Sequence, residues 1–215
     1  MARFLYGVTQ PHITALTNGR VASIDSSSIR IWDTATGRCR ILKADDKEVL
    51  CLAVLQDDRL ASGSADGSVR IWDVRKRKST VMNGHEKAVF SLAALPDGRL
   101  ASGSEDGAIR IWDLNTAESQ ILTGRSGPVH NLVVLPGGRL ASGSREQLSV
   151  RIWNLPALDR DDANVVKLKH SQVDHISEKK ERIGFLEAPA TFLTYWGEMD
   201  CLVVGTEAGI EFFNL

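Results

Sequence analysis

The chain has 215 residues, of which 43% are hydrophobic and 25% charged, and its net charge at pH 7 is −1. Such a nearly neutral chain has no general electrostatic attraction to nucleic acid or to an anionic membrane. It contains no run of 18 apolar residues, and its first ten residues lack the apolar stretch of a secretory signal. We therefore expect a soluble cytoplasmic protein.

In chain order, the first predicted element is a short apolar strand at residues 2–6, with the sequence ARFLY. Four related segments follow at residues 20–33, 59–73, 98–113 and 138–154, and each ends in an IRIW or VRIW motif. The Trp residues of these motifs stand at positions 32, 72, 112 and 153. This nearly constant spacing is typical of a supersecondary unit that repeats along the chain and stacks on its neighbours.

The copy at 98–113 indicates what one unit contains. Two short β runs flank Asp106-Gly107, a pair that favours a tight turn. Further apolar runs lie at 89–95 and 119–122, and connections this short leave no room for helices, so we predict a four-stranded antiparallel sheet. Its second strand has small residues and its third has large ones, which suits sheets that stack radially around an axis.

The period fails after residue 154. Trp153 and Phe213, which we align as equivalent residues, are separated by more than one repeat. We therefore expect a strand at 165–169 within a long insertion at about 156–190, and a last hairpin at 202–214. In an alternative register Trp196 would be the third-strand Trp, but the glycine spacing of 202–214 fits the hairpin better.

These motifs resemble the WD40-repeat family, because units of about 40 residues end in IRIWD and Gly84-His85 opens the unit that ends at Trp112. The resemblance implies an all-β fold, a β-propeller of four-stranded antiparallel blades. In that family a His, a Ser or Thr, an Asp and a Trp form a structural hydrogen-bonded network within one blade. The matching residues are His85, Ser102, Asp106 and Trp112.

Counting repeats in this way gives five blades in a single domain, residues 1–215. Residues 2–6 would supply the outer strand of the last blade and close the ring, which hides both free edges. The alternative is an open arc, part of a larger ring, that exposes two apolar blade faces. Such an arc would need a partner chain or a second copy to cover these faces, so a homo-oligomer belongs to this alternative.

Strand directions alternate, so the turns between second and third strands lie at the same end of the propeller as the linkers between blades. Loops held on a rigid scaffold commonly carry binding, and the resemblance implies that a protein or peptide binds at this end. Any one of its charged residues, taken alone, is more simply explained as solvated surface. The predicted protein-binding face consists of Asp46, Lys47, Glu86, Lys87, Glu105, Arg125, Arg145, Glu146 and Gln147.

One basic cluster, RKRK at residues 75–78, lies in a predicted turn at the opposite end. It is either a nuclear-import signal or phosphate contact, or a solubilising turn. No aromatic residues interleave it, which argues against nucleic acid as a partner.

The sequence predicts no cofactor and no metal. The two His residues of HSQVDH, at 170–175, have a spacing that is weak support for a metal site. Cys39, Cys51 and Cys201 are odd in number and lie in predicted strands, so we expect three buried, reduced thiols.

We therefore interpret the chain as a non-catalytic protein–protein interaction scaffold and not as an enzyme. His85, Ser102 and Asp106 are the residue types of a hydrolase triad, but the family arrangement places them inside one packed blade without a cleft. The alternative is an enzyme or a small-ligand-binding propeller that uses the central channel. It would need titratable groups converging from several inner strands, and apart from His130 these strands offer no Asp, Glu or His.

Overall fold

The computed structural model describes residues 13–16, 19–44, 47–122, 127–144, 146, 150–155, 165–167, 190–197, 201–206 and 210–214. Over these residues the chain is all-β, as predicted. Helical structure there is limited to 3-10 turns, and η1 (Gln56–Asp58) and η2 (Pro136–Gly138) lie wholly within the described residues. The predicted strand at 2–6 and most of the predicted insertion at 156–190 lie outside the described residues.

The described strands form five sheets, each built from consecutive strands. The first sheet contains β1 (Ile13–Leu16), β2 (Arg20–Asp25), β3 (Ser28–Asp33) and β4 (Cys39–Lys43). The second contains β5 (Val49–Val54), β6 (Arg59–Ser64), β7 (Val69–Asp73) and β8 (Lys78–Met82). The third contains β9 (Val89–Ala94), β10 (Leu100–Ser104), β11 (Ile109–Trp112) and β12 (Ser119–Leu122). The fourth contains β13 (Asn131–Leu135), β14 (Arg139–Gly143), β15 (Val150–Asn154) and β16 (Val165–Lys167), and the last contains β17 (Ala190–Trp196), β18 (Cys201–Thr206) and β19 (Ile210–Asn214).

Every sheet is an antiparallel meander, which confirms the predicted unit. In the third sheet, Leu100 pairs with Ala94 on one side and with Trp112 on the other. Strand β16 lies within the predicted range 165–169 and pairs with β15. Trp196 ends the first strand of the last sheet, so the alternative register, which made it a third-strand residue, is wrong.

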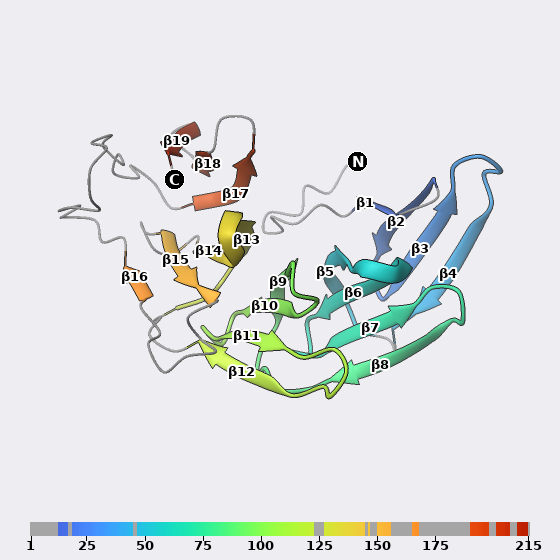
Figure 1. Cartoon of the computed structure of the whole chain (residues 1–215). Helices are drawn as coiled ribbons and strands as arrows, with labels where there is room; N and C mark the ends of the chain where they lie inside the picture. Colours follow the sequence, from blue (N-terminus) through green and yellow to red (C-terminus); the bar gives the residue numbers. More distant parts are fainter. Residues whose placement is uncertain are drawn as a thin grey trace.

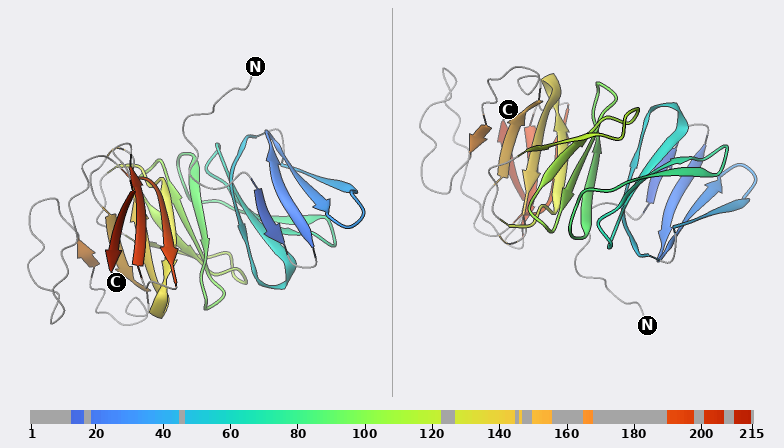
Figure 2. Two further views of the ribbon diagram at one scale, coloured as in Figure 1. Left: turned by 90° about the horizontal axis from the view of Figure 1, so that it is seen from above. Right: turned by 90° about the horizontal axis from the view of Figure 1, so that it is seen from below.

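The five sheets stand side by side in an arc, with β5, β9 and β13 on its inside and β4, β8 and β12 at its circumference (Figure 1). Figure 2 shows the same succession, from the blue first sheet to the red last sheet, seen from above and from below. Among the described residues, no strand of the first sheet is hydrogen-bonded to a strand of the last. These residues thus form an open propeller and not a closed ring.

The core consists of layers between consecutive sheets, because alternate side chains of a strand point to opposite faces. In β11, Ile109 and Ile111 pack against the following sheet, and we call this side the leading face. Trp112 packs against Ile71 of the preceding sheet, and we call this side the trailing face. The second, third and fourth sheets thus bury their third-strand Trp under the leading face of the sheet before, and these residues are Trp72, Trp112 and Trp153.

Small residues in the second strands allow the inner strand of the next sheet to approach closely. A Cβ added at Gly103 would lie 3.0 Å from Val129 Cβ and closer still to its Cγ1. A Cβ at Gly63 would lie 2.6 Å from both Cys51 Sγ and Val89 Cγ1. The predicted contrast between small second strands and large third strands thus has a packing cause at the inside of the arc.

The three cysteines do not share one environment. Cys51 and Cys201 are buried as expected, and burial raises the pKa of the Cys51 thiol to about 12. The expectation for Cys39 is wrong, because its side chain is exposed. Cys39 is paired with Trp32 in the sheet register, on the outer strand of the first sheet, where no preceding sheet covers it among the described residues.

Candidate interaction surface

The arc has two ends that differ in the loops they carry. The linker end carries the connections between sheets, such as 83–88, together with the turns between second and third strands, such as 105–108. The hairpin end carries the turns between first and second strands and those between third and fourth strands. The predicted protein-binding face lies at the linker end.

In the third sheet a hydrogen-bonded chain connects this end to the core. Trp112 Nε1 donates to Ser102 Oγ at 2.7 Å. Ser102 Oγ lies 2.7 Å from His85 Nε2, and His85 Nδ1 lies 2.9 Å from Asp106 Oδ2. Because an ionised carboxylate only accepts hydrogen bonds, the proton of a neutral His85 is on Nδ1, and Ser102 then donates to Nε2. The network runs from a buried Trp to a turn of the linker end.

Burial and hydrogen bonding set the charge of this network. Burial is the main cause that lowers the pKa of His85, and the hydrogen bond and charge of Asp106 oppose it only in part. For Asp106, burial raises the pKa, but hydrogen bonds from the Ala108 N–H, His85 and the Glu86 N–H outweigh burial and lower it overall. The folded state therefore favours a neutral imidazole beside an ionised carboxylate.

This constellation is not built for nucleophilic catalysis. The His85 side chain is fully buried, and the Ser102 residue is also inaccessible. Ser102 Oγ already contacts both Trp112 and His85, so no open side remains for a substrate carbonyl. The arrangement is that of a satisfied structural network.

The network also fixes the loops of the linker end to one another. The Glu86 N–H donates to Asp106 Oδ2 at 3.1 Å, and Ser104 Oγ donates to the Lys87 carbonyl at 3.1 Å. A salt bridge of 3.5 Å joins the exposed side chains of Lys87 and Glu105. The linker before the third sheet and the turn within that sheet are therefore held together as one surface.

The structure places five of the nine predicted face residues. All five are exposed at the linker end: Lys47, Glu86, Lys87, Glu105 and Glu146. The other four, Asp46, Arg125, Arg145 and Gln147, lie outside the described residues. Glu86, Lys87 and Glu105 are the ones that the described contacts bring together.

The other repeats keep only part of the network. Trp32, Trp72 and Trp153 donate to Ser23, Ser62 and Ser142 at 3.1, 2.8 and 2.9 Å. No histidine contributes a described contact to these pairs. Among the described contacts, the Trp–Ser pair of the third sheet is the one that continues through a His and an Asp to the linker end.

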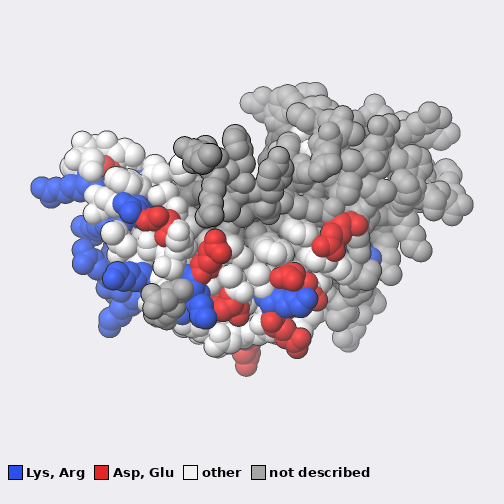
Figure 3. Space-filling view, turned by 180° about the vertical axis from the view of Figure 1, so that it is seen from behind, with Lys and Arg blue, Asp and Glu red and all other residues white. Residues whose placement is uncertain are grey.

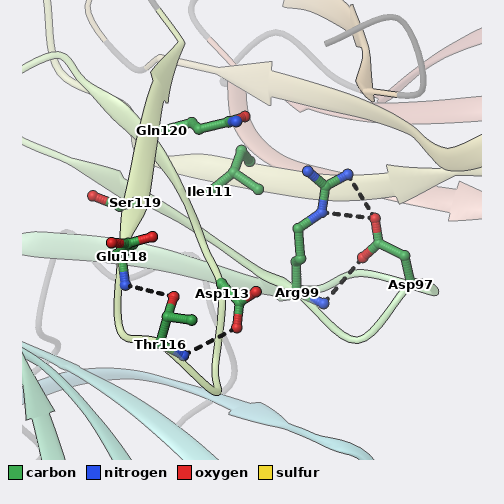
Figure 4. Close-up of a pocket in the computed structure, with 8 residues that line it drawn as sticks. All are labelled: Asp97, Arg99, Ile111, Asp113, Thr116, Glu118, Ser119 and Gln120. Carbon is green, nitrogen blue, oxygen red and sulfur yellow. Dashed lines mark hydrogen bonds and ion pairs between the residues drawn. The ribbon is translucent and has the colours of Figure 1, made fainter. Parts of the chain in front are cut away.

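A groove that the sequence did not predict lies at the hairpin end of the third sheet, with an open volume of about 840 Å³ (Figure 4). Its residues come from connections that are separate in sequence and meet only when the strands pair. An ion pair of 2.7 Å joins Arg99 and Asp97. The groove is mainly acidic and is lined by Asp97, Arg99, Ile111, Asp113, Thr116, Glu118, Ser119 and Gln120.

Basic side chains gather over the first two sheets, as Figure 3 shows from behind. The predicted basic cluster at 75–78 is exposed and belongs to this region. Arg75 Nη2 lies 2.7 Å from Asp58 Oδ2, and the same oxygen accepts a hydrogen bond of 2.9 Å from Arg20 of the first sheet. Arg75 therefore takes part in a contact between sheets, which gives that member of the cluster a structural role.

His130, the His residue that the sequence places on an inner strand, is buried and stacks on Phe90 with ring centroids 5.0 Å apart. Among the described residues, no group of three or more His, Cys, Asp or Glu side chains is arranged to hold a metal ion. The part of the chain that the structure describes also has no helix with the length and apolar character needed to span a membrane.

A comparison with protein-family models matches residues 37–73 and 76–113 to the family described as WD domain, G-beta repeat. The two matched segments end at Asp73 and Asp113, directly after the Trp residues of the second and third sheets. A search of curated proteins found no match.

Proposed function

Because the chain is a WD40-repeat protein, we propose that it is a non-catalytic scaffold and that its 215 residues form one domain. WD40 repeats generally mediate protein–protein interactions. The proposed binding surface is the linker end, and the proposed ligand is a protein or a peptide.

The observation that carries this proposal is the joined surface of Glu86, Lys87 and Glu105. Their side chains are exposed, whereas their backbone segments are fixed by Asp106 and Ser104. Loops that are already ordered lose less conformational entropy when a partner binds. Charges of both signs also give a partner a defined orientation on such a surface.

Affinity purification tests this proposal with a triple variant, Glu86→Ala, Lys87→Ala and Glu105→Ala. We expect the wild-type chain to retain a protein that the triple variant loses, with unchanged circular dichroism and unfolding midpoint. The matched control changes exposed residues of the hairpin end, Lys76→Ala, Arg77→Ala and Glu118→Ala, and should retain the protein. Undiminished binding by the linker-end variant would show that this face is not the binding surface.

We also propose a cytoplasmic location. The support is that Cys39, Cys51 and Cys201 all carry free thiols, as is usual in a reducing compartment. Fluorescence microscopy of the tagged chain tests this. If the chain is instead nuclear and leaves the nucleus after Arg77→Ala and Lys78→Ala, the basic cluster is an import signal.

A further inference from the structure

The first sheet exposes the face that the next three sheets bury. Trp72, Trp112 and Trp153 lie on trailing faces and are 4%, 1% and 2% exposed. Trp32 is the equivalent residue of the first sheet, and it is 37% exposed.

A second position of the same face shows the same difference. Ile13 pairs with Ser23 in the first sheet, as Leu52 pairs with Ser62 in the second. Ile13 is 61% exposed, whereas its equivalents Leu52, Leu92 and Leu132 are at most 3% exposed. Large apolar side chains of two different strands are therefore open to solvent on one side of one sheet.

This face nevertheless has the composition of a buried interface. Trp32 Nε1 donates to Ser23 Oγ, the same bond that orients each covered Trp. Val21 is paired with both Ala15 and Trp32 in the register, so the apolar positions of β1, β2 and β3 are continuous across the sheet. A surface that evolved only to meet water would carry polar residues at these alternate positions.

Arg30 marks where this face differs from a covered one. Its equivalent in the third sheet, Arg110, donates from Nη2 to the Gly84 carbonyl of the linker that arrives from the preceding sheet. Arg30 instead pairs with Asp25 of its own sheet, with both side chains partly exposed. The charge of Arg30 is thus balanced within its own sheet and needs no partner from a docking sheet.

The covered faces show what kind of surface fits. Trp112 packs in one cluster with Ala61, Val69 and Ile71 of the second sheet. Trp72 packs likewise with Ala22, Ile29 and Ile31 of the first. In both cases the covering sheet offers a small residue on its second strand and β-branched aliphatic residues on its third.

We infer that the trailing face of β1–β4 is a docking surface for a β-sheet supplied by a partner polypeptide. The partner sheet presents a leading face of the same kind, with Ala or Gly on one strand and Val or Ile on the next. Docking continues the series of sheet contacts already present in the chain by one more layer. This inference concerns a sheet face and does not depend on the proposed linker-end function.

The test supplies such a sheet in a defined form, as an extra copy of residues 49–88 fused before Met1 of the full chain. A covalent link keeps the effective concentration of the sheet high, so only its fit is tested. Hydroxyl-radical footprinting with peptide mass spectrometry then reports the oxidation of each Trp. We expect Trp32 to be oxidised readily in the wild-type chain and to approach the slow rates of Trp72, Trp112 and Trp153 in the extended chain.

The matched control carries Val69→Asp and Ile71→Asp in the added copy only, and should leave Trp32 as accessible as in the wild type. A second extension, made from residues 89–128, guards against one copy failing to fold. If neither extension protects Trp32, or if the Asp control protects it equally, the docking surface is refuted. A wild-type chain that dimerises with Trp32 protected would also overturn the inference, because a second copy would then be the occupant.

The two proposals can fail separately. We expect the linker-end triple variant, Glu86→Ala, Lys87→Ala and Glu105→Ala, to leave the oxidation of Trp32 unchanged, because these residues lie at a different surface.

Discussion

Ser102 is the residue on which the core network of the third sheet depends, because one hydroxyl serves two buried rings. It accepts from Trp112 Nε1 and contacts His85 Nε2, and all three groups are buried. Arg110 adds to this environment, with its Cζ 5.8 Å from the centroid of the Trp112 ring, within the range of a cation–π contact. In the second sheet, the described bond of the equivalent Ser62 is to Trp72 alone.

We therefore expect Ser102→Ala to be more destabilising than Ser62→Ala. Ser102→Ala leaves two buried ring nitrogens without their partner, which costs about 1–3 kcal/mol. Ser62→Ala removes one described hydrogen bond and costs about 1 kcal/mol. Urea unfolding followed by Trp fluorescence gives both values. Equal losses in the two variants would mean that the His85 contact contributes nothing.

The lowered pKa of His85 predicts how stability depends on pH. The unfolded side chain titrates near its ordinary value of 6.5, and burial places the folded pKa below this. Between the two pKa values the unfolded chain binds more protons than the folded chain. The contribution of His85 to the free energy of unfolding is therefore fully present above pH 6.5 and is lost as the pH falls through the folded pKa. The lowered pKa values of Asp66 and Asp106 act in a separate range, below the ordinary 3.8 of a carboxyl group.

The measurement is urea unfolding of the wild type and of His85→Gln at pH 7.5 and pH 5.5. We expect the wild type to lose more stability than the variant between these two conditions. The variant keeps a side chain that can hydrogen-bond but does not titrate. A pH dependence that is the same in both proteins would place its origin in other groups.

At the scale of single strands, a glycine in the second strand sets how closely the next sheet approaches. Gly103 of β10 lies against Val129, at the entry to the inner strand of the fourth sheet. Gly63 of β6 meets Val89 in the same manner one sheet earlier. A close approach of this kind tolerates no added methyl group unless the facing side chain becomes smaller.

We expect Gly103→Ala to destabilise the chain by about 1–3 kcal/mol, because the new Cβ overlaps Val129. Val129→Ala alone is destabilising as well, since it leaves a void in the core. The double variant should lose less than the sum of the two single variants, because each change relieves the other. Equilibrium unfolding of all four proteins measures this coupling, and strict additivity would contradict the proposed overlap.

At the scale of the whole molecule, the structure is a one-dimensional series of sheets, each stabilised by its neighbours. A repeat in the middle is covered on both faces. The first sheet is covered on its leading face, by the second sheet, and its trailing face is open at Ile13 and Trp32. The same sequence motif therefore contributes a different amount to the stability of the fold according to its position in the arc.

This position dependence gives a rank order for Trp substitutions. Trp112→Ala removes a ring that is 1% exposed and should cost about 3–5 kcal/mol. Trp32→Ala should cost clearly less, since its ring is partly solvated before the change. Denaturant midpoints of the two variants test the order. A loss for Trp32 as large as that for Trp112 would mean that the open face is covered in solution.

The resemblance to the WD40-repeat family implied the pairing of Ser102 with Trp112, and the sequence by itself determined the repeat and the four-stranded meander. These features depend on local turn chemistry and on alternation along a strand, and both are visible in one repeat. The exposed charged residues of the linker end were also predictable in part, because strand direction assigns each loop to one end.

Only the tertiary structure decided which faces of these sheets are covered. Nothing in SIRIWD distinguishes Trp32 from Trp72, since the difference is made by a neighbouring sheet and not by the residue itself. The same holds for the exposure of Cys39, for the contact of Arg75 and Arg20 with Asp58, and for the groove beside Arg99. In each case the partner is distant in sequence, and it becomes a neighbour only through the stacking of sheets or the pairing of strands.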